Sequence, residues 1–138
     1  MRHILSIAAA AIVAFSFSAY ADDAKPATEA KVSAPIVFFD IAGPDAAKLH
    51  GFYATVFGWG IDANNSITTP KLPGTLRQDP AEKIIYMGVP DINAALAQIT
   101  AAGGKVAMPR TVIPNVTIFA LFTDPAGNRM GLVEIPKS

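Results

Sequence analysis

The sequence predicts an α+β fold in which one unit, a strand followed by a helix and further strands, occurs twice. Two segments with the apolar spacing of an amphipathic helix each follow a short apolar run, and strand candidates come after each helix. The 138 residues are the size of one domain. Hydrophobic residues make up 51% of the chain and charged residues 16%, which is enough apolar material for a packed core.

The first unit occupies about residues 34–80. Its strand candidates are apolar runs flanked by turn formers, at residues 35–42, 59–63 and 66–69. A helix is expected over residues 45–57, because apolar side chains recur there on one helical face and Gly58 follows. Residues 70–79 hold too many turn formers for an element to be predicted.

The second unit occupies about residues 81–138 and repeats this order. A strand is expected over residues 83–89, and Asp91 is placed to cap a helix that stops at Gly103-Gly104. Three further strands, joined by turn residues, are expected at residues 105–112, 116–123 and 128–135.

The N-terminus has the pattern of a secretory signal peptide. A short positive region precedes an apolar run from Ile4 to Ser18, and Ala19-Tyr20-Ala21 is a small-x-small cleavage site. The run is shorter than the ~20 residues that a membrane span needs. We therefore expect a periplasmic or secreted protein, with a signal peptide at 1–21, a flexible linker at 22–33 and a single domain at 34–138.

Composition excludes several classes of function. Eleven Lys and Arg balance eleven Asp and Glu, so there is no basic surplus for binding nucleic acid. The absence of cysteine excludes disulfides, thiolate metal sites and cysteine nucleophiles. No glycine-rich loop opens a helix, and no Gly-x-Ser-x-Gly turn presents a serine nucleophile. We expect no nucleic-acid partner and, once the signal peptide is removed, no membrane partner.

Three groups of motifs carry a family resemblance. They are Phe52-Tyr53 with Val56-Phe57-Gly58-Trp59, Val89-Pro90-Asp91-Ile92 with Gly103-Gly104-Lys105, and Ile113-Pro114 with Asp124-Pro125-Ala126-Gly127-Asn128. In this order they resemble the vicinal oxygen chelate superfamily, the glyoxalase, bleomycin-resistance and dioxygenase group, over about residues 35–136. The resemblance implies two βαβββ modules whose sheet forms a cup-shaped, partly open barrel around a ligand. It also implies a homodimer, since members commonly form dimers.

The resemblance places metal ligands at positions where this chain cannot bind a metal. Enzymes of the superfamily hold a divalent ion through His and Glu side chains, and the motif register puts Phe38, Ile84 and Gly131 at those positions. After residue 21 the chain has one histidine, His50, whereas a facial triad needs two imidazoles. We therefore expect no metal and no cofactor, and we interpret His50 as a partly exposed surface side chain.

Alternation along the strands predicts the cup lining, provided that Phe38 faces inward. The candidate ligand-binding residues are Phe38, Asp40, Ile84, Tyr86, Arg129 and Gly131, with Ile36 and Val133 beside them. The other side chains of the first strand, expected to pack under the helices, are Val37, Phe39 and Ile41. Asp40 is a carboxylate in an apolar strand, so it needs a partner: Arg129 in a structural pair, or a ligand. Glu134 lies three residues after Gly131, so alternation places it on the opposite face of the strand.

Three classes of function remain. The first is an exported module that binds a small, largely apolar molecule in a metal-free cup. The second is an enzyme, either a glyoxalase-related lyase or isomerase or another metal-free enzyme that uses Asp40 as a base. The third is a dimeric structural or assembly module whose cup holds no ligand. Turnover separates the first two classes, and solution mass tests the third.

Overall fold

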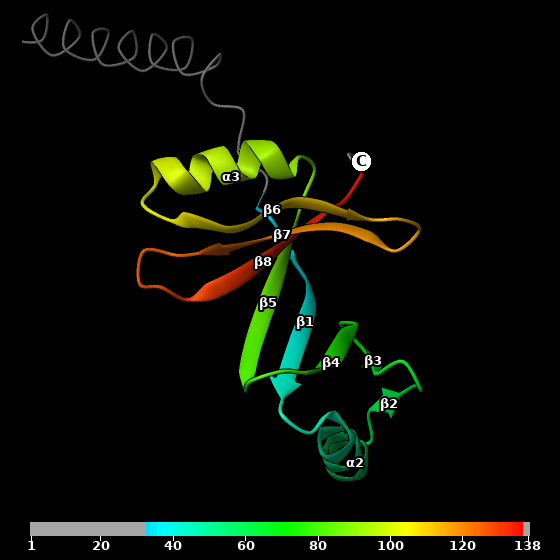
Figure 1. The fold of residues 1–138 in the computed structure, drawn as a ribbon. Coiled ribbons are helices and arrows are strands. Elements are labelled where there is room, and N and C mark those ends of the chain that lie inside the picture. The colour runs from blue at the N-terminus through cyan, green and yellow to red at the C-terminus, as the bar shows by residue number, and fades with distance from the viewer. Residues whose placement is uncertain (1–32, 137–138) are drawn as a thin grey trace, which may run out of the picture. The chain divides into compact units, whose positions relative to one another are not determined.

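The computed structural model describes residues 33–136, and the predicted signal peptide and all of the linker except Ser33 lie outside them (Figure 1). Ten elements follow one another: β1 (Ile36–Gly43), α2 (Ala46–Phe57), β2 (Gly60–Ile61), β3 (Ser66–Thr68), β4 (Gly74–Gln78), β5 (Glu82–Val89), α3 (Ile92–Ala101), β6 (Lys105–Ile113), β7 (Thr117–Thr123) and β8 (Arg129–Glu134). Their order is βαβββ twice over. The predicted α+β class is confirmed.

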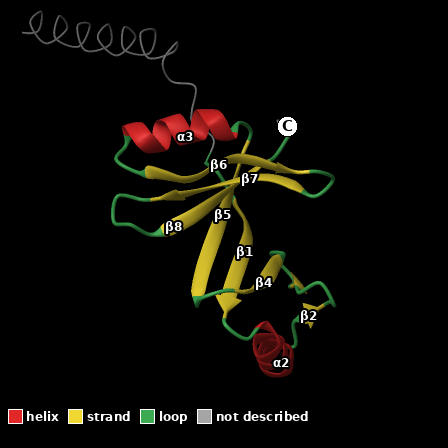
Figure 2. Ribbon diagram, in the orientation of Figure 1, coloured by secondary structure: helices red, strands yellow, loops and turns green. Residues whose placement is uncertain are grey.

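All eight strands of the described residues join one sheet, in the order β2-β3-β4-β1-β5-β8-β7-β6 (Figure 2). In each module the first strand pairs in parallel with the last, β1 with β4 and β5 with β8. The two first strands pair antiparallel with each other in the middle. The second module therefore repeats the pairing of the first, and the sheet stays open at β2 and β6. The prediction of two βαβββ modules in a partly open sheet is confirmed.

Both helices begin at the expected aspartates. The Asp45 side chain accepts a hydrogen bond from the Lys48 amide at 3.0 Å, and Asp91 accepts one from the Ala94 amide at 2.9 Å. Helix α2 ends at Gly58, whose φ of 66° is the left-handed conformation that glycine adopts without strain. Within residues 33–136 no helix is long and apolar enough to cross a membrane.

A packed cluster of core residues lies in the second module, where α3 covers one face of the sheet, and the first module buries Ala42, Ala46, Ile67 and Leu76. This cluster consists of buried side chains from α3, β7 and β8, namely Ile92, Leu96, Ala120, Phe122 and Leu132. Met87 pairs with Leu132 across β5 and β8 and packs against the same cluster. Because paired residues point to the same side of a sheet, this side is the helix face and the opposite side is the cup face.

Helix α2 is less buried than its apolar stripe predicts. Ala46 is the buried residue of this helix, while Phe52, Val56 and Phe57 are each more than half exposed. The Tyr53 ring stacks on the Trp59 ring, with centroids 5.1 Å apart. The first module thus presents an apolar helix surface to solvent.

Strand β4 lies in the segment for which no element was predicted. It is held by its parallel pairing with β1, where Phe39 lies opposite Gly74. A Cβ atom on Gly74 would lie 2.6 Å from the Phe39 ring, so this position requires glycine. Local composition did not reveal the strand, because its partner lies about thirty-five residues away in the chain.

Candidate ligand-binding site

The two central strands bring most of the predicted site residues onto one face. The register of β1 with β5 pairs Phe38 with Tyr86 and Asp40 with Ile84. The register of β5 with β8 pairs Tyr86 with Gly131. These five residues therefore share the cup face, and by alternation along β8 so does the sixth predicted residue.

A β-bulge changes the alternation at the start of β1. The register shifts between Ile36 and Phe38, so that Ile36 pairs with Met87, a residue of the helix face. The prediction that Ile36 faces the cup is wrong, and so is the prediction that Val37 packs under a helix, because Val37 borders the cup cavity described next. An extra residue at a bulge resets which side chains point to each face.

A cavity of about 430 Å³, the cup cavity, opens on the cup face beside the turn between β6 and β7. Its main lining residues are aromatic and branched apolar side chains: Phe38, Tyr86, Ile113, Val116, Phe119 and Val133. Phe38, Tyr86 and Val133 were predicted to face the cup, whereas Ile113, Val116 and Phe119 of the β6–β7 hairpin were not among the predicted residues. Cavities of this size and lining are typical of sites for small organic molecules.

Aromatic side chains fill the space in which enzymes of the superfamily that this sequence resembles hold a metal ion. The rings of Phe38 and Tyr86 meet edge to face, with centroids 5.6 Å apart. A Cβ atom on Gly131 would overlap the Tyr86 ring, and Ile84, two residues before Tyr86 on β5, is buried and apolar. The three positions offer no nitrogen or oxygen ligand, and within residues 33–136 no cluster of three or more His, Asp or Glu side chains is arranged to hold a metal. These residues do not fit a metal site of that kind.

Asp40 is a buried charge with one unsatisfied oxygen. The residue is 3% exposed, and its Oδ2 accepts a hydrogen bond from Nε of Arg77 at 2.7 Å. The prediction that Arg129 pairs with Asp40 is wrong. Arg77 lies on β4, where no strand was predicted, so sequence analysis could not place it beside β1. Oδ1 of Asp40 has no hydrogen-bond partner among the described residues.

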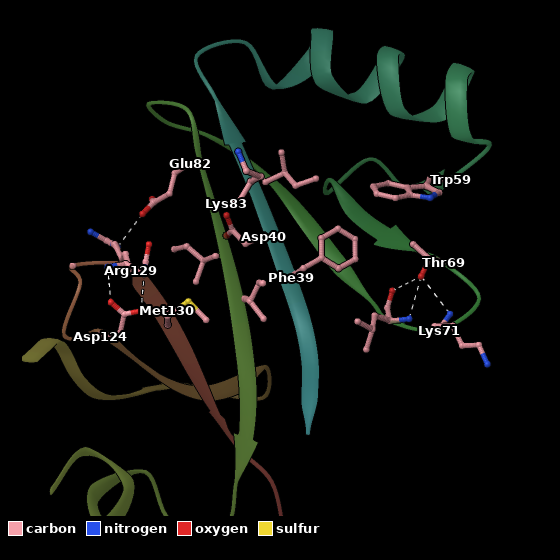
Figure 3. Close-up of a pocket in the computed structure, with 16 residues that line it drawn as sticks. Phe39, Asp40, Trp59, Thr69, Lys71, Glu82, Lys83, Asp124, Arg129 and Met130 are labelled. Carbon is pink, nitrogen blue, oxygen red and sulfur yellow. Dashed lines mark hydrogen bonds and ion pairs between the residues drawn. The ribbon is translucent and has the colours of Figure 1, made fainter. Parts of the chain in front are cut away.

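Further ion pairs extend this contact into a charged network. Arg77 also binds Asp79, Nη1 to Oδ2 at 2.5 Å, and Glu82, Nη2 to Oε1 at 3.2 Å. Oε2 of Glu82 lies 3.3 Å from Nε of Arg129, and Figure 3 shows this contact beside Asp40. The hydrogen bond to Asp40 is the main reason that the pKa of Arg77 is raised above its ordinary value. Arg129 thus joins the network through Glu82 instead of through Asp40.

Tyr86 lies between the cup cavity and the charged network. Its ring borders the cavity, and the charges that affect its pKa most are those of Asp40 and Arg77. Burial, and then the negative charge of Asp40, raise the pKa of Tyr86 above its usual range. The phenol is therefore neutral near pH 7 and able to donate a hydrogen bond.

A larger, open depression of about 1010 Å³ borders the far end of the central strands (Figure 3). Three predicted site residues, Asp40, Ile84 and Arg129, lie along it. Phe38 and Tyr86 instead border the cup cavity, and Gly131 lies beneath the Tyr86 ring. The six predicted residues therefore share a face but not a single cavity.

Glu134 points away from the cup, as alternation predicts. It pairs with Val89 of the helix face, and its Oε2 accepts a hydrogen bond from the Ile92 amide at 3.0 Å. Nη2 of Arg110 donates to Oε1 at 2.6 Å. The hydrogen bonds from Arg110 are the main cause that lowers the pKa of Glu134 to about 2. His50, on α2, is partly exposed, as expected.

Comparison with solved structures finds the same fold in epimerases. Methylmalonyl-CoA epimerase from Mycobacterium tuberculosis superposes with a TM-score of 0.56 at 12% identity, covering 80% of this chain and 95% of that one. The enzyme from Streptomyces coelicolor gives 0.54 at 17% identity, covering 74% and 98%. At these identities the likeness concerns the fold alone.

Comparison of sequences gives the family. A "Putative glyoxylase CFP32" of Mycobacterium bovis is 29% identical over 111 residues, which cover 67% of this chain and 42% of that protein. The chain thus spans less than half the length of this relative. The model of the Glyoxalase/Bleomycin resistance protein/Dioxygenase superfamily matches residues 35–132, well over half of the chain. With its two βαβββ modules, the chain belongs to the glyoxalase/bleomycin resistance protein/dioxygenase superfamily.

Proposed function

We propose that this protein is exported and binds a small, largely apolar molecule in the cup cavity without a metal. The cavity itself carries the proposal, because about 430 Å³ lined by aromatic and branched side chains suits such a ligand. The contact of Phe38 with Tyr86 above Gly131 supports the absence of a metal, since rings fill the place of the ligands. Export is supported by the signal-peptide pattern of residues 1–21.

The alternative is an enzyme, in line with the glyoxylase and epimerase names of the relatives. In a metal-free lyase or isomerase Asp40 would act as the base, and its Oδ1, which accepts no hydrogen bond from any described residue, favours this role. A base must reach a substrate proton, however, and Asp40 is buried behind its own ion pair. The binding role needs no such access, because the aromatic lining of the cavity is already open.

A thermal-shift screen of small apolar compounds against the purified protein tests the proposal. A binder at about 100 times its dissociation constant should stabilise the fold by ~2.7 kcal/mol. Phe119→Ala removes a ring from the cavity lining and should weaken binding, whereas Val106→Ala, on an exposed part of β6 outside the cavity, should not. Equal binding by both variants would place the ligand elsewhere, and consumption of a bound compound would establish the enzyme.

A second candidate is a homodimeric assembly module, favoured by the exposed apolar surface of α2. Phe52, Val56 and Phe57 together form an uncovered patch that a second copy of the chain would bury. Solution mass by light scattering tests this role. A dimer that dissociates in the Val56→Ser variant supports it, and a monomer at all concentrations rejects it.

A further inference from the structure

We infer that the turn between β6 and β7 inserts into the surface of a lipid bilayer, so that the cup cavity opens toward the lipid. The inference goes beyond the proposed function, and its test needs no ligand. Its first support is the exposure of apolar side chains at this turn, which ends the hairpin at the β6 edge of the sheet (Figure 1). Val116 is 75% exposed, Val112 54% and Ile113 41%. Apolar side chains gathered at one point of a surface mark a contact with a partner or a membrane.

The second support is that these side chains lie on both faces of the hairpin. Ile113 borders the cup cavity, whereas Val112 pairs with Ile118, which packs against the buried cluster around α3 on the helix face. The amide of Val116 donates a hydrogen bond to the Ile113 carbonyl at 3.0 Å, so Val116 lies at the tip. A second copy of the chain or another folded protein would cover one face of the hairpin, but a bilayer surrounds an inserted tip on all sides. The arrangement therefore favours lipid.

The size of this apolar surface also argues for lipid and against a protein partner. Even a large aromatic side chain buries only ~150–250 Å². Three partly exposed branched side chains therefore fall well below the ~800 Å² that each partner of a stable protein interface buries. Insertion at a membrane surface needs less, because apolar side chains enter only ~5–10 Å into the boundary between head groups and acyl chains.

The third support is the lack of charge around the turn. Residues 111–123 contain no charged side chain. Arg110, which precedes them, lies roughly 10 Å along the strand from Ile113, and its guanidinium group binds the Glu134 carboxylate. When the turn lies among the acyl chains, this ion pair is thus at the level of the head groups. Insertion of the turn buries no charge of the hairpin and requires no anionic lipid.

The cup cavity opens at the same turn. Ile113, Val116 and Thr117 belong to the turn and also border the cavity, whose lining contains no charged side chain. An apolar molecule dissolved in the bilayer could then enter the cavity from the acyl chains without crossing water. This contact replaces the expectation that the chain has no membrane partner once the signal peptide is removed.

Sedimentation of the purified protein with phosphatidylcholine vesicles tests the inference. The chain is used from residue 22 onward, because the apolar run from Ile4 to Ser18 would itself bind lipid and every described element begins after residue 33. We expect binding to these vesicles, with a gain of less than roughly threefold when about a third of the lipid is anionic phosphatidylglycerol. Val116→Asp should weaken binding by roughly tenfold or more. Val106→Asp is the matched control, the same substitution at an exposed position near the other end of β6, and should leave binding unchanged.

Tryptophan quenching locates the inserted part of the protein. Trp59 is the only tryptophan of the chain, and it stacks on Tyr53 of α2, the other exposed apolar surface. Vesicles of brominated phosphatidylcholine quench tryptophan side chains that enter the acyl region. We expect the fluorescence of the native protein to be unchanged and that of Val116→Trp to fall. Quenching of Trp59 in the native protein would show that α2 is inserted, and the inference would be wrong.

Three further outcomes would overturn the inference: no binding to phosphatidylcholine vesicles, binding that requires the anionic lipid, or equal binding by Val116→Asp and Val106→Asp. Circular dichroism checks that both variants fold. If Val116→Asp does not fold, the quenching of Val116→Trp decides the matter. The thermal-shift screen measures ligand binding in the cup cavity separately, so the proposed function and this inference can fail independently.

Discussion

Removing Arg77 should destabilise the fold far more than neutralising its partner Asp40. In Arg77→Met the buried carboxylate loses its donor, and no other described residue bonds to either of its oxygens. In Asp40→Asn the guanidinium keeps its contacts with Asp79 and Glu82 and is 31% exposed to water. An uncompensated charge is thus left behind only in the first variant.

The expected magnitudes follow from these exposures. Leaving a buried charge without its partner lowers the free energy of unfolding by ~3–5 kcal/mol. Because Arg77 is partly exposed, we expect Arg77→Met to lie near the lower end of this range, at about 3 kcal/mol. Asp40→Asn exchanges one charge-assisted hydrogen bond for a weaker one and should cost about 1 kcal/mol.

Urea denaturation with a common slope measures both free energies of unfolding. Arg110→Met is the matched control, because it breaks an exposed ion pair with Glu134 by the same substitution, and its loss should be smaller than that of Arg77→Met. If Arg77→Met and Asp40→Asn lost the same free energy of unfolding, the Asp40 carboxylate would not be an unpaired buried charge in the first variant. The reasoning from burial would then be refuted.

Four further predictions concern separate parts of the chain. Gly131→Ala should destabilise by about 1–3 kcal/mol through its overlap with the Tyr86 ring, and Tyr86→Ala in the same chain should restore part of the loss in urea melts. Because the pKa of Glu134 is lowered from 4.5 to about 2, its stabilisation is present above pH 4.5 and lost as the pH falls towards 2. Thermal melts recorded between pH 2 and 6 should show the loss of this stabilisation in the native chain and not in the Glu134→Gln variant. Intact mass of protein from its native compartment should start at Asp22, and retention of residues 1–21 would contradict export. Chelator should leave the melting temperature unchanged and elemental analysis should find no stoichiometric metal, whereas a stabilising metal would overturn metal independence.

Sequence periodicity predicted the elements whose pattern is local. The strand around Phe38, the two capped helices and the strands around Tyr86 and Gly131 all lie where apolar spacing and turn residues place them. Alternation then put the predicted residues on one face, because each of these strands is regular at the relevant positions.

Non-local pairing and backbone irregularity account for what was missed. Arg77 reaches Asp40 only because β4 lies beside β1, a pairing that the composition of residues 70–79 does not reveal. The bulge before Phe38 is likewise set by pairing with β5, so alternation placed Ile36 and Val37 on the wrong faces. The sequence also does not show that Phe38 and Tyr86 border one cavity while Asp40, Ile84 and Arg129 border another, because cavities depend on how side chains pack.

The antiparallel pairing of β1 with β5, here called the seam, connects ligand binding in the cup cavity with the cooperativity of unfolding. The second module has the buried cluster around α3, whereas the helix of the first module is largely exposed and its first strand pairs with β5 along this seam. Local opening of the first module should therefore cost less free energy than global unfolding. A ligand in the cup cavity would contact Phe38 on one side of the seam and Tyr86 on the other. A bound ligand would therefore raise the free energy of that local opening. The two modules, which differ in stability without a ligand, would then unfold as one cooperative unit.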